Sequence, residues 1–181
     1  MGHTTFGESF FSKVWVQGRR VRFGTDVAWS PGPFSVKGEF IRVADERRGQ
    51  GVGTDDPPPL ISRGWYVAGT WAVTGEPKVD DISPRRPLFQ AGAGAVELVG
   101  RYERLGFGSL PDGDTPSRSP RAANVLETSD RAWTFGVNWY LNRWARIQLN
   151  EVREWIEDPD RSPIVGRNVF WSRVCRLQFV L

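Results

Sequence analysis

Arginine is the residue type in this sequence that is best suited to chemistry. The 181-residue chain has 24 Lys and Arg residues, and Lys stands only at positions 13, 37 and 78. A GC-rich genome would favour Arg codons, but Arg also presents a planar fork of donors that binds phosphate or carboxylate and stays charged at any working pH. Five cations fall on the polar sides of alternating segments, and we expect them to bind anions: Arg22, Lys37, Arg101, Arg146 and Arg176.

Other chemistries find little support in the sequence. Glu97 and Glu103 are six residues apart, roughly 20 Å along a strand, which is too far for two carboxylates to act on one bond. The single His3 and single Cys175 exclude a His-rich metal site, a catalytic triad and an internal disulfide. Basic residues are dispersed and no RNA-binding motif is present, which argues against a nucleic-acid partner. We therefore expect neither an enzyme nor a cofactor.

The segments that carry the five cations have apolar residues at every second position, which is the period of a β-strand. No stretch approaches the roughly 20 apolar residues of a membrane-spanning helix. One face is thus apolar and the other polar. Seven segments show this pattern, and a weaker one at 10–17 is a candidate eighth: 21–29, 34–40, 65–74, 96–103, 133–141, 146–150 and 175–181.

The connections between these segments sort by length. Residues 31–33 and 142–144 are tight turns, whereas three connections are long and polar: 45–63, 105–131 and 157–168. Short turns at one end and long loops at the other are typical of an outer-membrane β-barrel. With the C-terminus on the periplasmic side, both tight turns fall there, as does the long segment 76–93. We expect a single domain over residues 1–181.

A soluble sandwich would show the same alternation, so the apolar face decides between the two. In a barrel it forms a lipid-facing belt, and Trp and Tyr gather near strand ends as they do at a lipid–water boundary. Arg facing lipid near the midplane would cost about 2–4 kcal/mol each, which places the cations inward. There they either meet permeant anions or pair with Glu39, Glu97 and Glu103 to hold the wall. The expected belt is Trp65, Val67, Trp71, Phe135, Val137, Leu149, Leu177 and Phe179.

Four blocks of the sequence resemble the phosphate-selective porin O/P family and stand in the same order. They are GWYVAGTW at 64–71 with TGE at 74–76, AVELVGRY at 95–102, TFGVNWYLN at 134–142 and RLQFVL at 176–181. The resemblance covers most of residues 64–181 and identifies them with the C-terminal half of the family barrel. It implies a 16-stranded barrel, a trimer, a location in the outer membrane of a Gram-negative-type bacterium, and passage of phosphate or polyphosphate along an Arg-lined path.

Chain length adds one expectation of its own. An eight-stranded barrel has an interior just wide enough for side chains, whereas open channels need about 16 strands. We therefore expect a partial porin, which agrees with the lack of signal-peptide features in MGHTTFGESFF. Passive, binding-assisted anion diffusion is the function we expect. The alternative is a soluble or small closed β-barrel or sandwich that binds a ligand or serves as a structural module without a channel.

Overall fold

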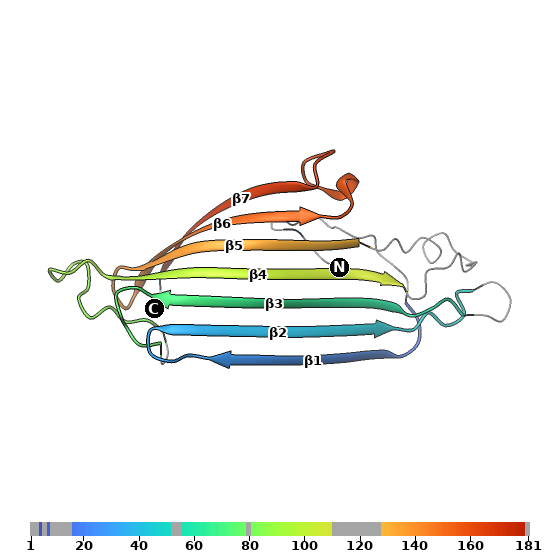
Figure 1. Cartoon of the computed structure of the whole chain (residues 1–181), viewed down its shortest axis with the longest axis horizontal. Coiled ribbons are helices and arrows are strands. Elements are labelled where there is room, and N and C mark those ends of the chain that lie inside the picture. Colours follow the sequence, from blue (N-terminus) through green and yellow to red (C-terminus); the bar gives the residue numbers. More distant parts are fainter. Residues whose placement is uncertain are drawn as a thin grey trace.

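The computed structural model describes Thr4, Gly7 and residues 16–51, 56–78, 81–109 and 128–179. Its strands form one antiparallel sheet in which each strand pairs with its neighbour in the sequence. Figure 1 shows this single layer. The strands are β1 Arg20–Trp29, β2 Phe34–Asp45, β3 Leu60–Ala72, β4 Ala95–Ser109, β5 Thr128–Tyr140, β6 Ala145–Ile156 and β7 Val169–Phe179, with a short 3-10 helix at Pro159–Arg161.

The predicted all-β, antiparallel fold is confirmed by these seven strands. Most of the candidate eighth strand at 10–17 lies outside the described residues. Gln17, at its end, forms an isolated bridge with Arg47. In the structure the sheet is open, with β1 and β7 as its two edges.

The register carries the alternation of each strand across the whole sheet. Residues directly opposite each other in an antiparallel pair point to the same face. One such row runs through Trp71, Leu98, Val137, Leu149 and Cys175 from β3 to β7. Because every strand keeps this parity, the sheet has one apolar face and one polar face.

The strands extend further than the alternation indicated. Residues 60–63, 105–109 and 128–131 were expected to lie in loops, but they belong to β3, β4 and β5. Backbone pairing continues there, from Leu60 opposite Ser109 to Phe107 opposite Thr128. Polar residues stand on both faces at 60–63 and 128–131, and at 105–109 the apolar residues Leu105 and Phe107 stand on the polar face, so the period-two signal fades while the hydrogen-bonded ladder does not.

The two ends of the sheet differ in their connections (Figure 1). At one, the turn end, lie the β1–β2 turn, the β5–β6 turn and the described parts, 73–78 and 81–94, of the segment 73–94. At the other, the loop end, lie 46–51, 56–59, 157–168 and the strand ends that flank 110–127. The β1–β2 turn closes through Phe34 N–H donating to the Pro31 carbonyl at 3.1 Å, with Gly32 at a φ of 57°. The β5–β6 turn closes as Asn142 Oδ1 accepts from the backbone N–H of Ala145 at 2.9 Å.

Charged side chains hold the base of the β2–β3 connection at the loop end. The backbone N–H of Arg19 donates to the Glu46 carboxylate at 2.9 Å, and the Arg48 guanidinium lies 2.7 Å from the same group. Both contacts favour the ionised carboxylate, so the pKa of Glu46 is lowered from its usual value.

The sheet has no second layer in the described part of the chain, and its buried apolar clusters are small. One cluster at the turn end joins Ala72, Ile82, Ala95 and Tyr140, and another at the loop end joins Ile156 and Phe170. Among the residues that the structure describes, no helix is long and apolar enough to cross a membrane.

Candidate functional site

The apolar face is an exposed belt. All eight residues that we expected to face lipid lie on it and are exposed, with Phe135 at 58% and Phe179 at 65%. Its aromatic rings contact one another across strands, since Tyr102 lies 5.2 Å from Trp65 and 4.6 Å from Trp133 between ring centroids. A soluble sandwich would bury this face against a second sheet, so the belt favours a surface that meets lipid.

The five candidate cations share the opposite, polar face. Lys37 stands opposite Ala68, which stands opposite Arg101. The same pairing places Arg22, Arg146 and Arg176 on that side of the sheet, as the following pairs show: Arg22 with Val43, Arg146 with Tyr140 and Gln178, and Arg176 with Gln148.

Two of the five are tied to carboxylates. The Arg101 guanidinium donates to Glu103 on its own strand at 2.6 Å and lies 3.9 Å above the centre of the Tyr66 ring. Arg146 donates to Asp81 at 3.1 Å and to Gln178 at 3.0 Å. These contacts fit the alternative in which inward Arg residues hold the wall.

The other three, Arg22, Lys37 and Arg176, are exposed. In the described ranges none of them has an acidic group within ion-pair distance. Their charge is thus available to a mobile anion.

Sequence reasoning missed Lys78, an enclosed cation that lies against the polar face. Lys78 forms an ion pair with Glu97, and only 9% and 6% of the two side chains are exposed. Glu97 also accepts from Asn138 Nδ2 at 2.7 Å and from the Tyr140 hydroxyl at 3.0 Å. Lys78 comes from the aperiodic segment 73–94, where alternation gives no face. In the alternative where inward Arg residues hold the wall, Glu97 is one of their partners, but the structure pairs it with Lys78.

A polar cavity of about 360 Å³ surrounds this network near the turn end. The Ser35 and Thr70 hydroxyls share a hydrogen bond of 2.7 Å, and Lys78 Nζ donates to Ser35 at 3.4 Å. Lys37 and Asp81 also line the cavity. The two ammonium groups share the cavity with the Glu97 and Asp81 carboxylates, and Lys37 is the one of the two lysines that is in no ion pair with a described residue.

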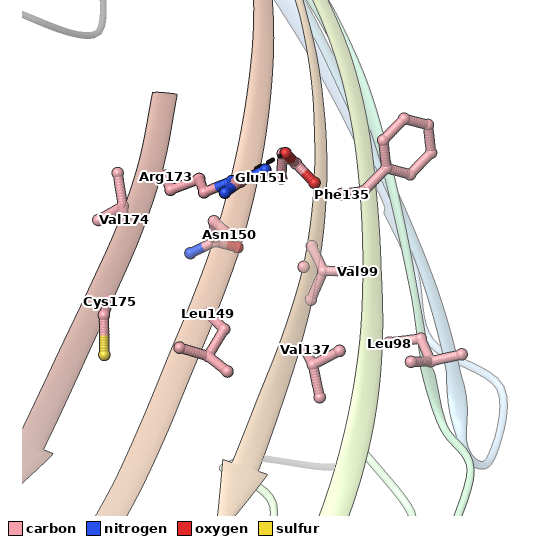
Figure 2. A pocket seen from close by; sticks show the side chains of 11 residues that line it. Leu98, Val99, Phe135, Val137, Leu149, Asn150, Glu151, Arg173, Val174 and Cys175 are labelled. Atoms are coloured by element: carbon pink, nitrogen blue, oxygen red, sulfur yellow. Dashed lines mark hydrogen bonds and ion pairs between the residues drawn. The ribbon is translucent and has the colours of Figure 1, made fainter. Parts of the chain in front are cut away.

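A second hollow, of about 590 Å³, lies over β4 to β7 (Figure 2). Its lining mixes the two faces of the sheet, with Leu149 from the belt and Asn150 from the polar side. Arg173 donates to Glu151 at 3.1 Å there. The hollow follows the relief of a one-layer sheet, and we assign it no ligand.

A row of exposed arginines borders the belt toward the loop end, on the belt's own face. We call it the arginine band: Arg42, Arg63, Arg104, Arg131, Arg153 and Arg173. Arg42 stands directly opposite Arg63, and Arg104 directly opposite Arg131. The alternating parity contained this row, but sequence reasoning considered only the cations of the polar face.

In the described ranges, His, Cys, Asp and Glu form no group of three or more that could hold a metal ion.

The sequence was compared with known proteins. The family model of phosphate-selective porin O and P matches residues 8–155. Porin O of Pseudomonas aeruginosa is 25% identical over 139 residues, which are 72% of this chain and 29% of that protein. The chain thus spans less than a third of that relative's length. The exposed belt, the opposite polar face and the family match agree, and the chain belongs to the phosphate-selective porin O and P family.

Proposed function

We propose that this chain forms part of the wall of an outer-membrane pore that passes small anions such as phosphate by passive, binding-assisted diffusion. The observation that carries the proposal is a one-layer sheet with an exposed apolar belt on one face and cations on the other. Such a sheet needs lipid on one side and water on the other. The relative named Porin O supports the same function.

The border between belt and arginine band supports a membrane orientation. Between β2 and β7 this border shifts by two residues toward the turn end three times. The shifts fall between β3 and β4 at Arg104, between β5 and β6 at Arg153, and between β6 and β7 at Arg173. Three steps span about 20 Å along the strands, and five strand spacings span about 24 Å. The border therefore runs at about 40° to the direction that is perpendicular to the strands within the sheet. If the border lies parallel to the membrane surface, the strands are tilted by the same angle from the membrane normal, which matches the 35–45° strand tilt of outer-membrane barrels.

The turn-end border of the belt moves in the same direction. This border again shifts by two residues toward the turn end three times. The aromatic residues that mark it are Trp29 on β1, the facing pair Phe34 and Trp71, Trp139 on β5 and Phe179 on β7. Over six strand spacings this is an inclination of about 35°. Two parallel borders define a tilted band. From Phe34 to Arg42 its height is about 20 Å after projection, close to the roughly 25 Å of a bilayer's apolar band.

On the polar face, the three unpaired cations attract anions and the paired ones hold the wall. Arg22, Lys37 and Arg176 raise the local anion concentration, and weak successive contacts let an anion move onward. Lys37, beside the Ser35 and Thr70 hydroxyls of the turn-end cavity, offers a stopping point. We further propose a homotrimer in the outer membrane, in keeping with the family.

The test measures ion selectivity in the assembled pore that contains this chain. A triple variant, Arg22→Gln, Lys37→Gln and Arg176→Gln, removes the unpaired cations. The reversal potential under a KCl gradient shifts toward cation selectivity. The shift grows at low salt because the Debye length increases from about 8–10 Å near physiological ionic strength to about 30 Å at 0.01 M. The matched control, Arg63→Gln, Arg104→Gln and Arg131→Gln, removes the same charge from the belt face and leaves the reversal potential unchanged.

Equal shifts in both triple variants would contradict the assignment of faces. An unchanged potential in the first variant, with the barrel folded, would mean that these cations do not meet the permeant ion.

A further inference from the structure

The arginine band has no role in the pore proposed above, because it lies on the belt face. Its charge is also poorly neutralised. Of its six members, Arg173 pairs with Glu151, and within the described ranges the other five are in no ion pair. We propose that the arginine band binds the phosphate groups of lipid headgroups at the membrane surface on the loop side. The proposal rests on the proposed function, since it requires the belt to face lipid.

The spacing of the band suits a divalent oxyanion. Residues directly opposite in an antiparallel pair have Cα atoms about 4.5–5.5 Å apart. Arg42 with Arg63, and Arg104 with Arg131, thus each bring two guanidinium forks to one place. Like charges at such positions repel each other. A phosphate between them relieves the repulsion and accepts charge-assisted hydrogen bonds from both forks.

Aromatic contacts keep part of the band at the depth of a lipid interface. The Arg153 guanidinium lies 4.6 Å from the Trp155 ring centre and 5.3 Å from that of Trp171. Trp prefers the lipid–water boundary, and Arg near it keeps its stem in the apolar zone and its charge in the headgroup zone. The band therefore lies at the height of headgroup phosphates.

Continuity with the belt selects a lipid as the occupant over free phosphate. The belt meets the band without interruption, as Trp65 stands opposite Arg104 and Trp133 opposite Arg153. A lipid whose acyl chains lie along the belt brings its phosphate to the band by the same contact. Free phosphate gains nothing from the belt.

The experiment measures lipid binding by the assembled pore that contains this chain, in maltoside micelles. The probe is lipid A, a glycolipid with two phosphates, and native mass spectrometry counts the lipid bound. The variant Arg63→Gln, Arg104→Gln and Arg131→Gln weakens binding by about tenfold or more, because it removes three charge-assisted contacts. The matched control, Arg85→Gln, Arg86→Gln and Arg143→Gln, removes three exposed arginines at the turn end and binds as the unchanged chain does.

Two further arms keep the test decisive if the triple variant folds poorly. The unchanged chain binds dephosphorylated lipid A about tenfold more weakly than lipid A. An equimolar amount of inorganic phosphate does not displace the lipid. Equal binding of both lipids, equal binding by the band variant and the unchanged chain, or displacement by phosphate would each overturn the proposal.

Failure here is distinguishable from failure of the proposed pore. If the arginine-band variant binds lipid A normally while the polar-face variant shifts the reversal potential, the headgroup proposal is wrong and the pore proposal stands. If lipid A binding depends on the band but the reversal potential does not shift, the belt faces lipid but the cations of the polar face do not select anions.

Discussion

The ion pair of Lys78 and Glu97 shows how a single residue connects segment 73–94 to the sheet. Lys78 donates its backbone N–H to the Gly32 carbonyl at 2.9 Å while its side chain reaches Glu97 on β4. It therefore joins the β1–β2 turn to the middle of the sheet. Both charges are nearly enclosed, so each depends on the other for compensation.

Replacing Lys78 by Met leaves the Glu97 carboxylate enclosed without a cation. We expect the free energy of unfolding to fall by about 3–5 kcal/mol, the usual effect of breaking a buried pair. Glu97→Gln combined with Lys78→Met restores most of it, since an amide still accepts from Asn138 and Tyr140. Urea unfolding of the assembled pore that carries each version of the chain, followed by Trp fluorescence, measures the difference. A single variant as stable as the unchanged chain would show that the pair adds nothing.

At the scale of elements, period-two alternation predicted strands well because lipid and water impose opposite polarity on neighbouring residues. It located the seven strands and both tight turns. It failed where the apolar residues do not follow the apolar face, as Leu105 and Phe107 show, and where no period exists, as around Lys78. Backbone pairing and chain reversal in those places depend on contacts with distant residues, which local patterning does not encode. The roles of the five cations stay a prediction.

Gly94 marks the start of β4 for a reason that single-sequence patterning does not reveal. Its φ is 77°, and a Cβ there would stand 2.3 Å from the Tyr140 carbonyl. Gly94→Ala therefore introduces both backbone strain and a clash with the backbone, and we expect the free energy of unfolding to fall by about 1–3 kcal/mol. Gly100→Ala on the same strand meets nothing within 4 Å and changes stability by less than about 0.5 kcal/mol. Urea unfolding measures the difference, and we expect a lower midpoint for Gly94→Ala than for Gly100→Ala. Equal midpoints would contradict the role assigned to Gly94.

At the scale of the whole molecule, the sheet's open edges govern behaviour. Among the residues that the structure describes, no strand pairs with the outer sides of β1 and β7. In lipid, each unsatisfied group costs several kcal/mol. The wall therefore needs further strands before it is stable in a bilayer.

We expect the isolated 181-residue chain to self-associate or aggregate and not to conduct as a monomer. Light scattering in micelles measures its mass, and planar-bilayer recordings measure conductance. Defined single-channel steps from a chain shown to be monomeric would refute this expectation.

The drift of the two belt borders also constrains whatever completes the sheet. Six residues of drift over five or six strand spacings amount to a stagger of roughly one residue per strand. Carried around 16 strands, the hydrogen-bond register would be displaced by roughly 16 residues when the last strand meets the first. That total must be even, since an odd shear would exchange the water-facing and lipid-facing side chains at the seam. Two-residue steps in the closing strands would keep that total even, which makes closure a matter of matching shear and not only of adding strands.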